Sequence, residues 1–119
     1  GAIACNYLGL HDDETAKLWR AFIPYSHYDG IATWPYPASG RDSALTRLKR
    51  LAKRPQFICH EITGSQFNLA ATKKWIESSN IKANLTFTET GFRNHNDAWL
   101  LRTSPAREHL RAWLKRVLQ

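Results

Sequence analysis

Three histidines, one glutamate and one arginine have the side-chain types that acid–base chemistry on a phosphate ester requires. His27, His60 and His95 can exchange protons near neutral pH, and Glu61 and Arg93 add a carboxylate and a cation. A ribonuclease that uses no metal needs a general base, a general acid and a cation beside the phosphate. These residues therefore indicate one candidate activity, a small metal-independent nuclease or toxin domain.

The spacing of the histidines argues against such a site. The chain has five histidines, and no two of them lie at the i, i+4 spacing of a metal-binding pair on a helix. Scattered histidines are more often surface residues or hydrogen-bonded structural residues than catalysts. We therefore expect His27, His60 and His95 not to converge. The sequence predicts no catalytic residue, no metal site and no cofactor.

Positive charge is concentrated in two short segments. Residues 41–54 carry six Arg or Lys against one acidic residue, and residues 105–116 carry four against one, so the rest of the chain is nearly neutral although the net charge is +7. A basic stripe on a neutral domain is typical of proteins that bind phosphate backbones, because each bound phosphate releases counterions. Basic faces that are simply solvated are the alternative. If the two segments share one face, nucleic-acid binding is favoured, whereas opposite faces weaken it.

The expected order of elements indicates which surfaces would bind. Several helices, a hairpin and a last helix follow one another, an order that resembles winged-helix proteins, in which one helix enters the major groove and the hairpin touches the backbone. The resemblance makes residues 66–79 the recognition helix and residues 93–96 the tip of the wing. The side chains expected to contact nucleic acid are Arg47, Lys49, Arg50, Lys53, Arg54, Gln66, Asn68, Lys73, Lys74, Arg93, His95, Arg107, Arg111 and Lys115.

Aromatic residues gather in the long irregular stretch of residues 25–40, among Pro and Gly residues. Such rings can stack on unpaired bases, which contributes about 1–3 kcal/mol for each base, or line a pocket for a flipped base. They can equally pack onto the domain and bury themselves. The rings in question are Tyr25, Tyr28, Trp34 and Tyr36.

Local patterns predict the elements in chain order. A strand is expected over residues 2–8, a helix from the cap at Asp12 to Pro24, and a helix over residues 42–54 whose Leu45, Leu48 and Leu51 form the apolar stripe. A strand follows over residues 56–63, then the helix 66–79 capped by Ser65, and a β-hairpin over residues 82–104. The last helix is capped by Ser104 and begins at Pro105.

Length and composition bound the class of protein. With 119 residues, of which 43% are hydrophobic, residues 1–119 can form one domain without disulfides or metal. Cys5 and Cys59 lack motif spacing, and no stretch is apolar and long enough to span a membrane, so we expect an intracellular, cytoplasmic or nucleoid-associated protein with no membrane partner. The chain has no Met and begins at Gly1, which suggests a domain excised from a longer protein.

The sequence thus predicts a small α+β domain with about four helices and a β-hairpin. Its predicted partner is nucleic acid, DNA in preference to RNA, bound by basic helices and the hairpin. Two alternatives stay open. One is the nuclease or toxin domain, and the other is a protein-interaction domain whose basic helices meet an acidic partner.

Overall fold

Strand β1 (Gln56–His60) forms the centre of the fold, and all five of its residues are buried. β2 (Leu85–Glu89) pairs with it in parallel on one side. Extended residues 22–25 pair with it in parallel on the other side, through the bridges Phe22–Gln56 and Tyr25–Cys59. The computed structural model, which describes residues 2–119, therefore contains three parallel segments whose carboxyl ends lie at one edge.

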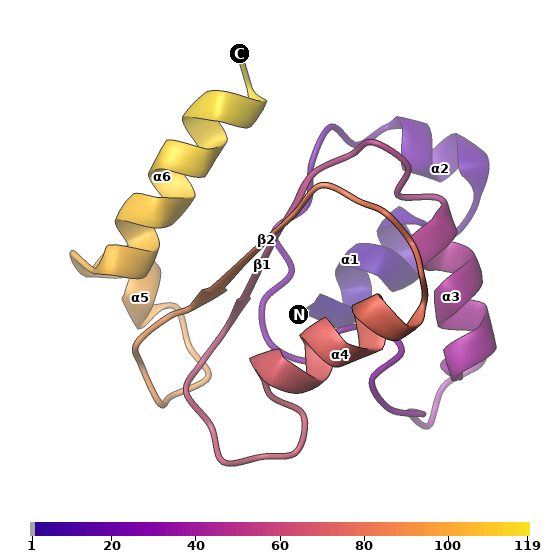
Figure 1. Ribbon diagram of the computed structural model, residues 1–119, viewed down its shortest axis with the longest axis horizontal. Helices are drawn as coiled ribbons and strands as arrows, with labels where there is room; N and C mark the ends of the chain where they lie inside the picture. Colours follow the sequence, from indigo (N-terminus) through magenta and orange to yellow (C-terminus); the bar gives the residue numbers. More distant parts are fainter. Residues whose placement is uncertain (1) are drawn as a thin grey trace.

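Helices cover both faces of these segments (Figure 1). One side carries α1 (Ala2–Gly9), α2 (Asp13–Lys17), α3 (Arg41–Lys49) and α4 (Leu69–Ser78), and the other carries α5 (Ala98–Leu101) and α6 (Pro105–Val117). The chain passes through α3 between residues 22–25 and β1, and through α4 between β1 and β2. Parallel neighbours need such crossover connections, because a tight turn cannot join them.

The two helical layers bury separate apolar cores, because successive side chains of a strand point to opposite faces. Ile58 joins the core that contains Leu48 of α3 and Trp75 of α4. Its neighbour Phe57 joins the second core, with Trp99 of α5 and Trp113 of α6. β1 is therefore the shared wall of both cores.

Gly30 fixes the course of the loop that follows the first parallel segment. Its φ of 100° lies in the left-handed region that favours glycine, and a Cβ at this position would lie 2.5 Å from the Trp75 ring. The Trp75 Nε1 donates a hydrogen bond to the backbone oxygen of Asp29 at 2.9 Å. The loop is thereby held against α4.

The predicted α+β class is confirmed, but two predicted elements are wrong. Residues 2–8 form helix α1 rather than a strand, and the buried residues Ala2, Asn6 and Gly9 follow helical spacing. Short apolar runs fit either element, and here packing of one helical face decides. The expected hairpin is also wrong: β2 pairs with the distant β1, and residues 98–101 form α5. Among residues 2–119, the wing of winged-helix proteins has no counterpart.

The boundaries of two helices differ from the predicted ones. α2 ends at Lys17, so the residues expected to continue it to Pro24 are free to pair with β1. α4 begins at Leu69, because Asn68 rather than Ser65 caps it by accepting a hydrogen bond from the Ala71 amide. The predicted Ser104 cap of α6 is confirmed. No helix within residues 2–119 is both long and apolar enough to cross a membrane.

Candidate active site

Five side chains meet where the three parallel segments end. Ser26 and His27 follow the first segment, His60 ends β1 and Glu61 follows it, and His95 lies in the loop after β2. We call these five residues the strand-end cluster. Ligands of open α/β sheets commonly bind at the carboxyl ends of the strands. The topology thus brings to one place residues that are far apart in the sequence.

The histidines of the strand-end cluster converge. The ring centroids of His27 and His95 are 6.1 Å apart, and those of His27 and His60 are 6.3 Å apart. Two rings at this separation can both reach one group placed between them, since each hydrogen bond spans about 2.6–3.2 Å. The expectation that these histidines would not converge is wrong, because parallel pairing aligns segment ends whatever their separation in sequence.

Glu61 connects the members of the cluster. Its Oε1 accepts a hydrogen bond from Ser26 Oγ at 3.2 Å and lies 3.5 Å from His95 Nδ1. The side chain is only 8% exposed. Burial raises the pKa of Glu61, but its hydrogen bonds and the neighbouring His60 and His95 outweigh burial and leave the pKa below its ordinary value. The carboxylate is therefore ionised at neutral pH and can orient His95 directly and His27 through Ser26.

His27 is oriented through Ser26. A carboxylate only accepts hydrogen bonds, so the Ser26 hydroxyl donates to Glu61 and accepts from His27 Nδ1, which lies 3.2 Å away. His27 Nδ1 then carries the proton, and Nε2 presents a lone pair. Burial, followed by the neighbouring His60, lowers the pKa of His27. His27 is thus a neutral imidazole at pH 7, as a general base must be.

Ser26 adopts an unusual backbone conformation in this network. Its φ is 72°, in the left-handed region, and the residue is 1% exposed. Its amide donates to the Cys59 carbonyl at 2.9 Å, which extends the pairing with β1 to the end of the segment. Non-glycine residues in this region are uncommon and cluster at functional sites. The conformation directs the hydroxyl toward Glu61.

His60 supports the cluster from the interior. Its exposed fraction is 1%, and its Nδ1 lies 2.9 Å from the Glu61 carbonyl oxygen. Because a carbonyl only accepts, Nδ1 carries the proton, and Nε2 is buried without a hydrogen-bond partner in the described part of the chain. His60 therefore fixes the backbone of Glu61, and proton transfer to a ligand is left to His27 and His95.

His95 occupies the solvent side of the cluster. Its side chain is 53% exposed, and its ring stacks on Tyr25 with centroids 5.0 Å apart and planes inclined by 9°. Stacking holds the plane of the ring, while Glu61 faces Nδ1. A carboxylate in this position can accept a hydrogen bond from Nδ1 and so orient the ring, as in catalytic triads. His95 is thereby positioned for proton transfer.

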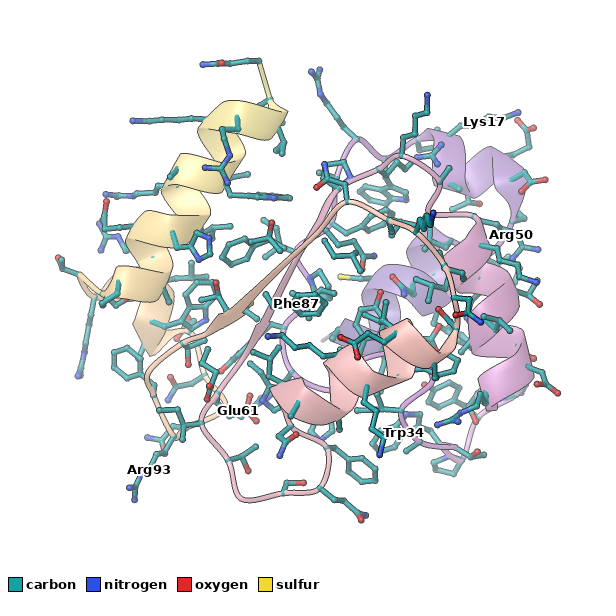
Figure 2. All side chains as sticks on the ribbon, in the orientation of Figure 1. Lys17, Trp34, Arg50, Glu61, Phe87 and Arg93 are labelled. Carbon is teal, nitrogen blue, oxygen red and sulfur yellow. The ribbon has the colours of Figure 1, made fainter. Side chains whose placement is uncertain are left out.

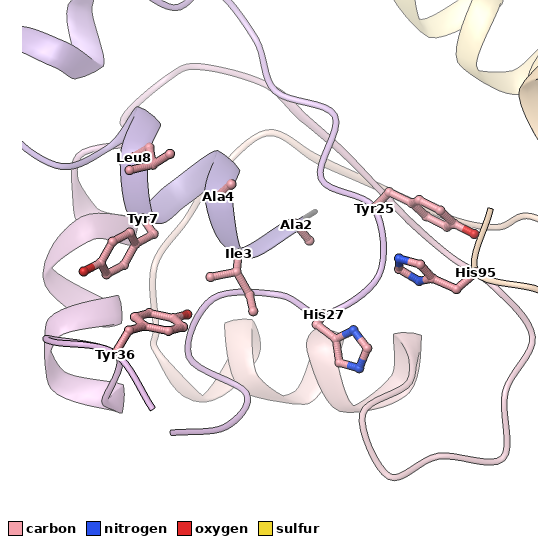
Figure 3. A pocket seen from close by; sticks show the side chains of 9 residues that line it. All are labelled: Ala2, Ile3, Ala4, Tyr7, Leu8, Tyr25, His27, Tyr36 and His95. Carbon is pink, nitrogen blue, oxygen red and sulfur yellow. The ribbon is translucent and has the colours of Figure 1, made fainter. Parts of the chain in front are cut away.

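A cleft of about 430 Å³ opens beside His27 and His95. Figure 3 shows His27 and His95 at one end of the cleft and Tyr7 and Tyr36 at the other, with Ile3 of α1 between them. This volume lies within the range of about 300–1,000 Å³ that is common for small-molecule sites. The cleft gives a ligand access to His27 and His95.

Arg93 lies two residues before His95 and is exposed; in Figure 2 it extends outward from the loop, while Glu61 lies further inside. The structure thus places the predicted cation in the same loop as one of the histidines. Among residues 2–119, no group of three His, Cys, Asp or Glu side chains is arranged to hold a metal ion.

The arginines of α3 and of the turn after it are used to hold the fold. Arg47 was expected to face solvent or a ligand, but it is 5% exposed and forms two hydrogen bonds with Asp29, at 2.7 and 2.9 Å. Arg50 donates to the carbonyls of residues 10 and 11, and Arg54 donates to the Trp19 carbonyl. The expectation that Arg47 is available to a phosphate is wrong, because a buried carboxylate pairs with it. Lys49 and Lys53 are exposed.

Of the residues around α4 that were predicted to contact nucleic acid, one caps the helix and the others are exposed. Asn68 is the N-cap, and Lys73 Nζ lies 5.2 Å from the centroid of the Phe87 ring. Gln66 and Lys74 line a groove of about 360 Å³ together with Arg41, whose guanidinium lies 4.9 Å from the centroid of the Trp75 ring. This groove brings together two cations from different helices.

The basic face of α6 lies far from α3. Figure 1 places α6 and α3 on opposite sides of the parallel segments, and each packs into a different core. Lys115 is exposed, Arg111 pairs with Glu108 at 3.3 Å, and Arg107 donates to the Leu101 carbonyl. By the criterion set from the sequence, this arrangement weakens an interface that spans both helices.

The four aromatic residues of the long loop have different environments. Tyr28 is 0% exposed and donates to Gln56, so its expected role in base stacking is wrong. Trp34 is partly buried, with its ring centroid 5.6 Å from that of His27. Tyr25 stacks on His95, and Tyr36 lines the cleft. Two of the rings, Tyr25 and Trp34, therefore lie beside the histidines, and Tyr36 lies at the other end of the cleft.

Sequence reasoning missed three residues of this site: Ser26, Ile3 and Tyr7. Ile3 and Tyr7 belong to the segment that was expected to be a strand, so they were not placed beside the loop. One signal could have found the cluster: a histidine follows within two residues of the end of each apolar run that contains Phe22 or Ile58. Comparison with protein-family models, curated proteins and solved structures gives no match to this chain.

Proposed function

We propose that this protein cleaves RNA by general acid–base catalysis with His27 and His95. The observation that carries the proposal is that these two rings lie 6.1 Å apart beside an open cleft, with the buried carboxylate of Glu61 facing His95 directly and linked to His27 through Ser26. A net charge of +7 favours encounter with a polyanion. The sequence favoured DNA, but RNA is proposed because its 2′-hydroxyl supplies the nucleophile for this pair of groups.

The proposed reaction balances without an added reagent. His27 Nε2 removes the proton of the 2′-hydroxyl, and the oxygen attacks the adjacent phosphorus. The bond between phosphorus and the 5′-oxygen breaks, and protonated His95 gives its proton to that oxygen. The products are a 2′,3′-cyclic phosphate and a free 5′-hydroxyl. Arg93, in the same loop as His95, would offset charge on the phosphate.

The test is cleavage of an end-labelled RNA compared with DNA of the same sequence. We expect RNA to be cut, DNA to stay intact, and His27→Ala or His95→Ala to lower the rate about 10²- to 10⁴-fold. His11→Ala is the matched control, because His11 is exposed and outside the strand-end cluster. Equal cleavage by native protein and His27→Ala, or no cleavage by the native protein, would refute the proposal.

The pH profile provides a second readout. Because burial lowers the pKa of His27, its base form persists below the ordinary histidine value of about 6.5. The acidic limb of kcat/KM should therefore lie below that value. A limb above pH 7 would contradict the role of His27 as the base.

Binding of nucleic acid without cleavage is the second candidate function. The groove that contains Arg41, Gln66 and Lys74 favours it, since two cations and an amide face the same space. Binding in the cleavage assay with no product would select this candidate.

A further inference from the structure

We propose that the cleft between α1 and the loop of residues 31–40 binds a nucleobase of the RNA, next to the phosphate held by His27 and His95. This inference rests on the proposed function, because the histidine pair determines where the phosphate lies. The cleft is continuous with both histidines and ends at Tyr36 and Tyr7 (Figure 3).

The walls of the cleft fit a flat heteroaromatic ring. Ile3, Ala4 and Leu8 of α1 supply an apolar side, and the rings of Tyr7 and Tyr36 close one end. A base has two apolar faces and a polar edge, so apolar walls can cover its faces while a few polar atoms read its edge. A free phosphate would gain nothing from these walls.

The tyrosine end of the cleft is held in place before any ligand binds. The Tyr7 hydroxyl donates to the Pro37 carbonyl at 2.8 Å, and the Arg47 guanidinium lies 4.9 Å from the centroid of the Tyr7 ring. Tyr36 meets Tyr7 edge to face, with centroids 4.9 Å apart. A fixed wall reduces the ordering cost of binding.

Tyr36 also offers an unused hydrogen-bonding group. Its hydroxyl oxygen is buried and has no hydrogen-bond partner within residues 2–119, and in Figure 3 it points toward the side of Ile3 and His27. Burial raises the pKa of Tyr36, which keeps the hydroxyl neutral and able to donate. Unpaired buried polar groups are uncommon in native proteins, and the edge of a base would satisfy this one.

The test is calorimetric titration of the native protein with the four ribonucleoside 3′-monophosphates and with inorganic phosphate. We expect at least one nucleotide to bind about 5- to 150-fold more tightly than phosphate, the gain that stacking of one base provides. Ile3→Trp should fill the cleft and remove that gain. Ile23→Trp is the matched control, since Ile23 is 40% exposed and lines a different hollow.

Tyr36→Phe keeps the ring and removes the hydroxyl, so it should weaken the preferred nucleotide several-fold and leave phosphate binding unchanged. Circular dichroism of each variant checks that it is folded. Equal affinity of the native protein for nucleotides and phosphate, or full nucleotide selectivity in Ile3→Trp, would overturn the inference. If RNA is cut but nucleotides bind no better than phosphate, only the base site fails. If nucleotides bind selectively and RNA is not cut, only the proposed function fails.

Discussion

The basic segment beginning at α3 is predicted from the sequence to contact a ligand, whereas the histidines of the strand-end cluster are predicted not to converge. The structure favours the opposite assignment of the two regions. The segment carries the highest density of cations, yet Arg47, Arg50 and Arg54 are all bonded to the protein itself. The histidines looked scattered, yet His60 and His95 both face the Glu61 carboxylate and His27 is linked to it through Ser26. Charge density therefore reports little about availability, because a cation with an internal partner is already satisfied.

The largest expected effect tests whether Arg47 is structural. Arg47→Ala leaves the carboxylate of Asp29, which is 0% exposed in its side chain, without a partner. We expect the free energy of unfolding to fall by about 3–5 kcal/mol. Lys49→Ala, on the exposed face of the same helix, should change it by less than about 0.5 kcal/mol. Urea denaturation measures both. Equal stabilities of the two variants would show that the fold does not depend on Arg47, and α3 would again be a candidate ligand-binding surface.

A smaller effect concerns Glu61 and pH. Its pKa is lowered in the folded protein, so its stabilising contribution is present above the ordinary glutamate pKa and is lost as pH falls through the lower folded value. Glu61→Gln should reduce stability at pH 7 by about 1–3 kcal/mol, because Ser26 loses a charged acceptor.

Below about pH 4.3, the ordinary glutamate value, the variant should also lose less stability on further acidification than the native protein does, because Glu61 itself titrates there. Because the pKa of His27 is also lowered, the native protein should begin to lose stability already below about pH 6.5. Denaturation at a series of pH values gives both slopes. Parallel pH dependences of the native protein and Glu61→Gln would show that this carboxylate does not hold the cluster together.

The smallest expected effect compares single lysines. With a 2′-O-methyl RNA oligomer, which lacks the nucleophile, Lys74→Ala should lower the slope of log affinity against log salt by about one. Lys115→Ala should leave it unchanged, because α6 lies on the opposite side of the sheet from the groove with Lys74. Fluorescence anisotropy at several salt concentrations measures the slopes. Equal losses in both variants would indicate diffuse binding and remove the distinction between the groove with Lys74 and the exposed face of α6.

The sequence was sufficient to predict those elements that are determined by residues close to one another in the chain. The Ser104 cap, the periodicity that buries Trp113, and the β-forming run of β1 are all local signals, and the structure contains them. Pairing partners were not predictable in this way. Nothing near Arg47 in the sequence identifies Asp29 as its partner, and nothing near β2 indicates that it joins β1 rather than a hairpin. The histidine cluster depends on those distant pairings, which is why spacing alone did not reveal it.

The pairing of β1 with its two parallel neighbours also determines when the site comes into existence during folding. Phe22 pairs with Gln56, and Gln56 with Leu85, so each step closes a long loop of chain. Such non-local contacts slow folding relative to local helix formation. A nascent chain that has emerged only as far as α4 contains His27, Glu61 and all the other residues that line the cleft, but not His95. The site can therefore be completed only after β2 and the loop that carries His95 have been synthesised and β2 has joined the sheet.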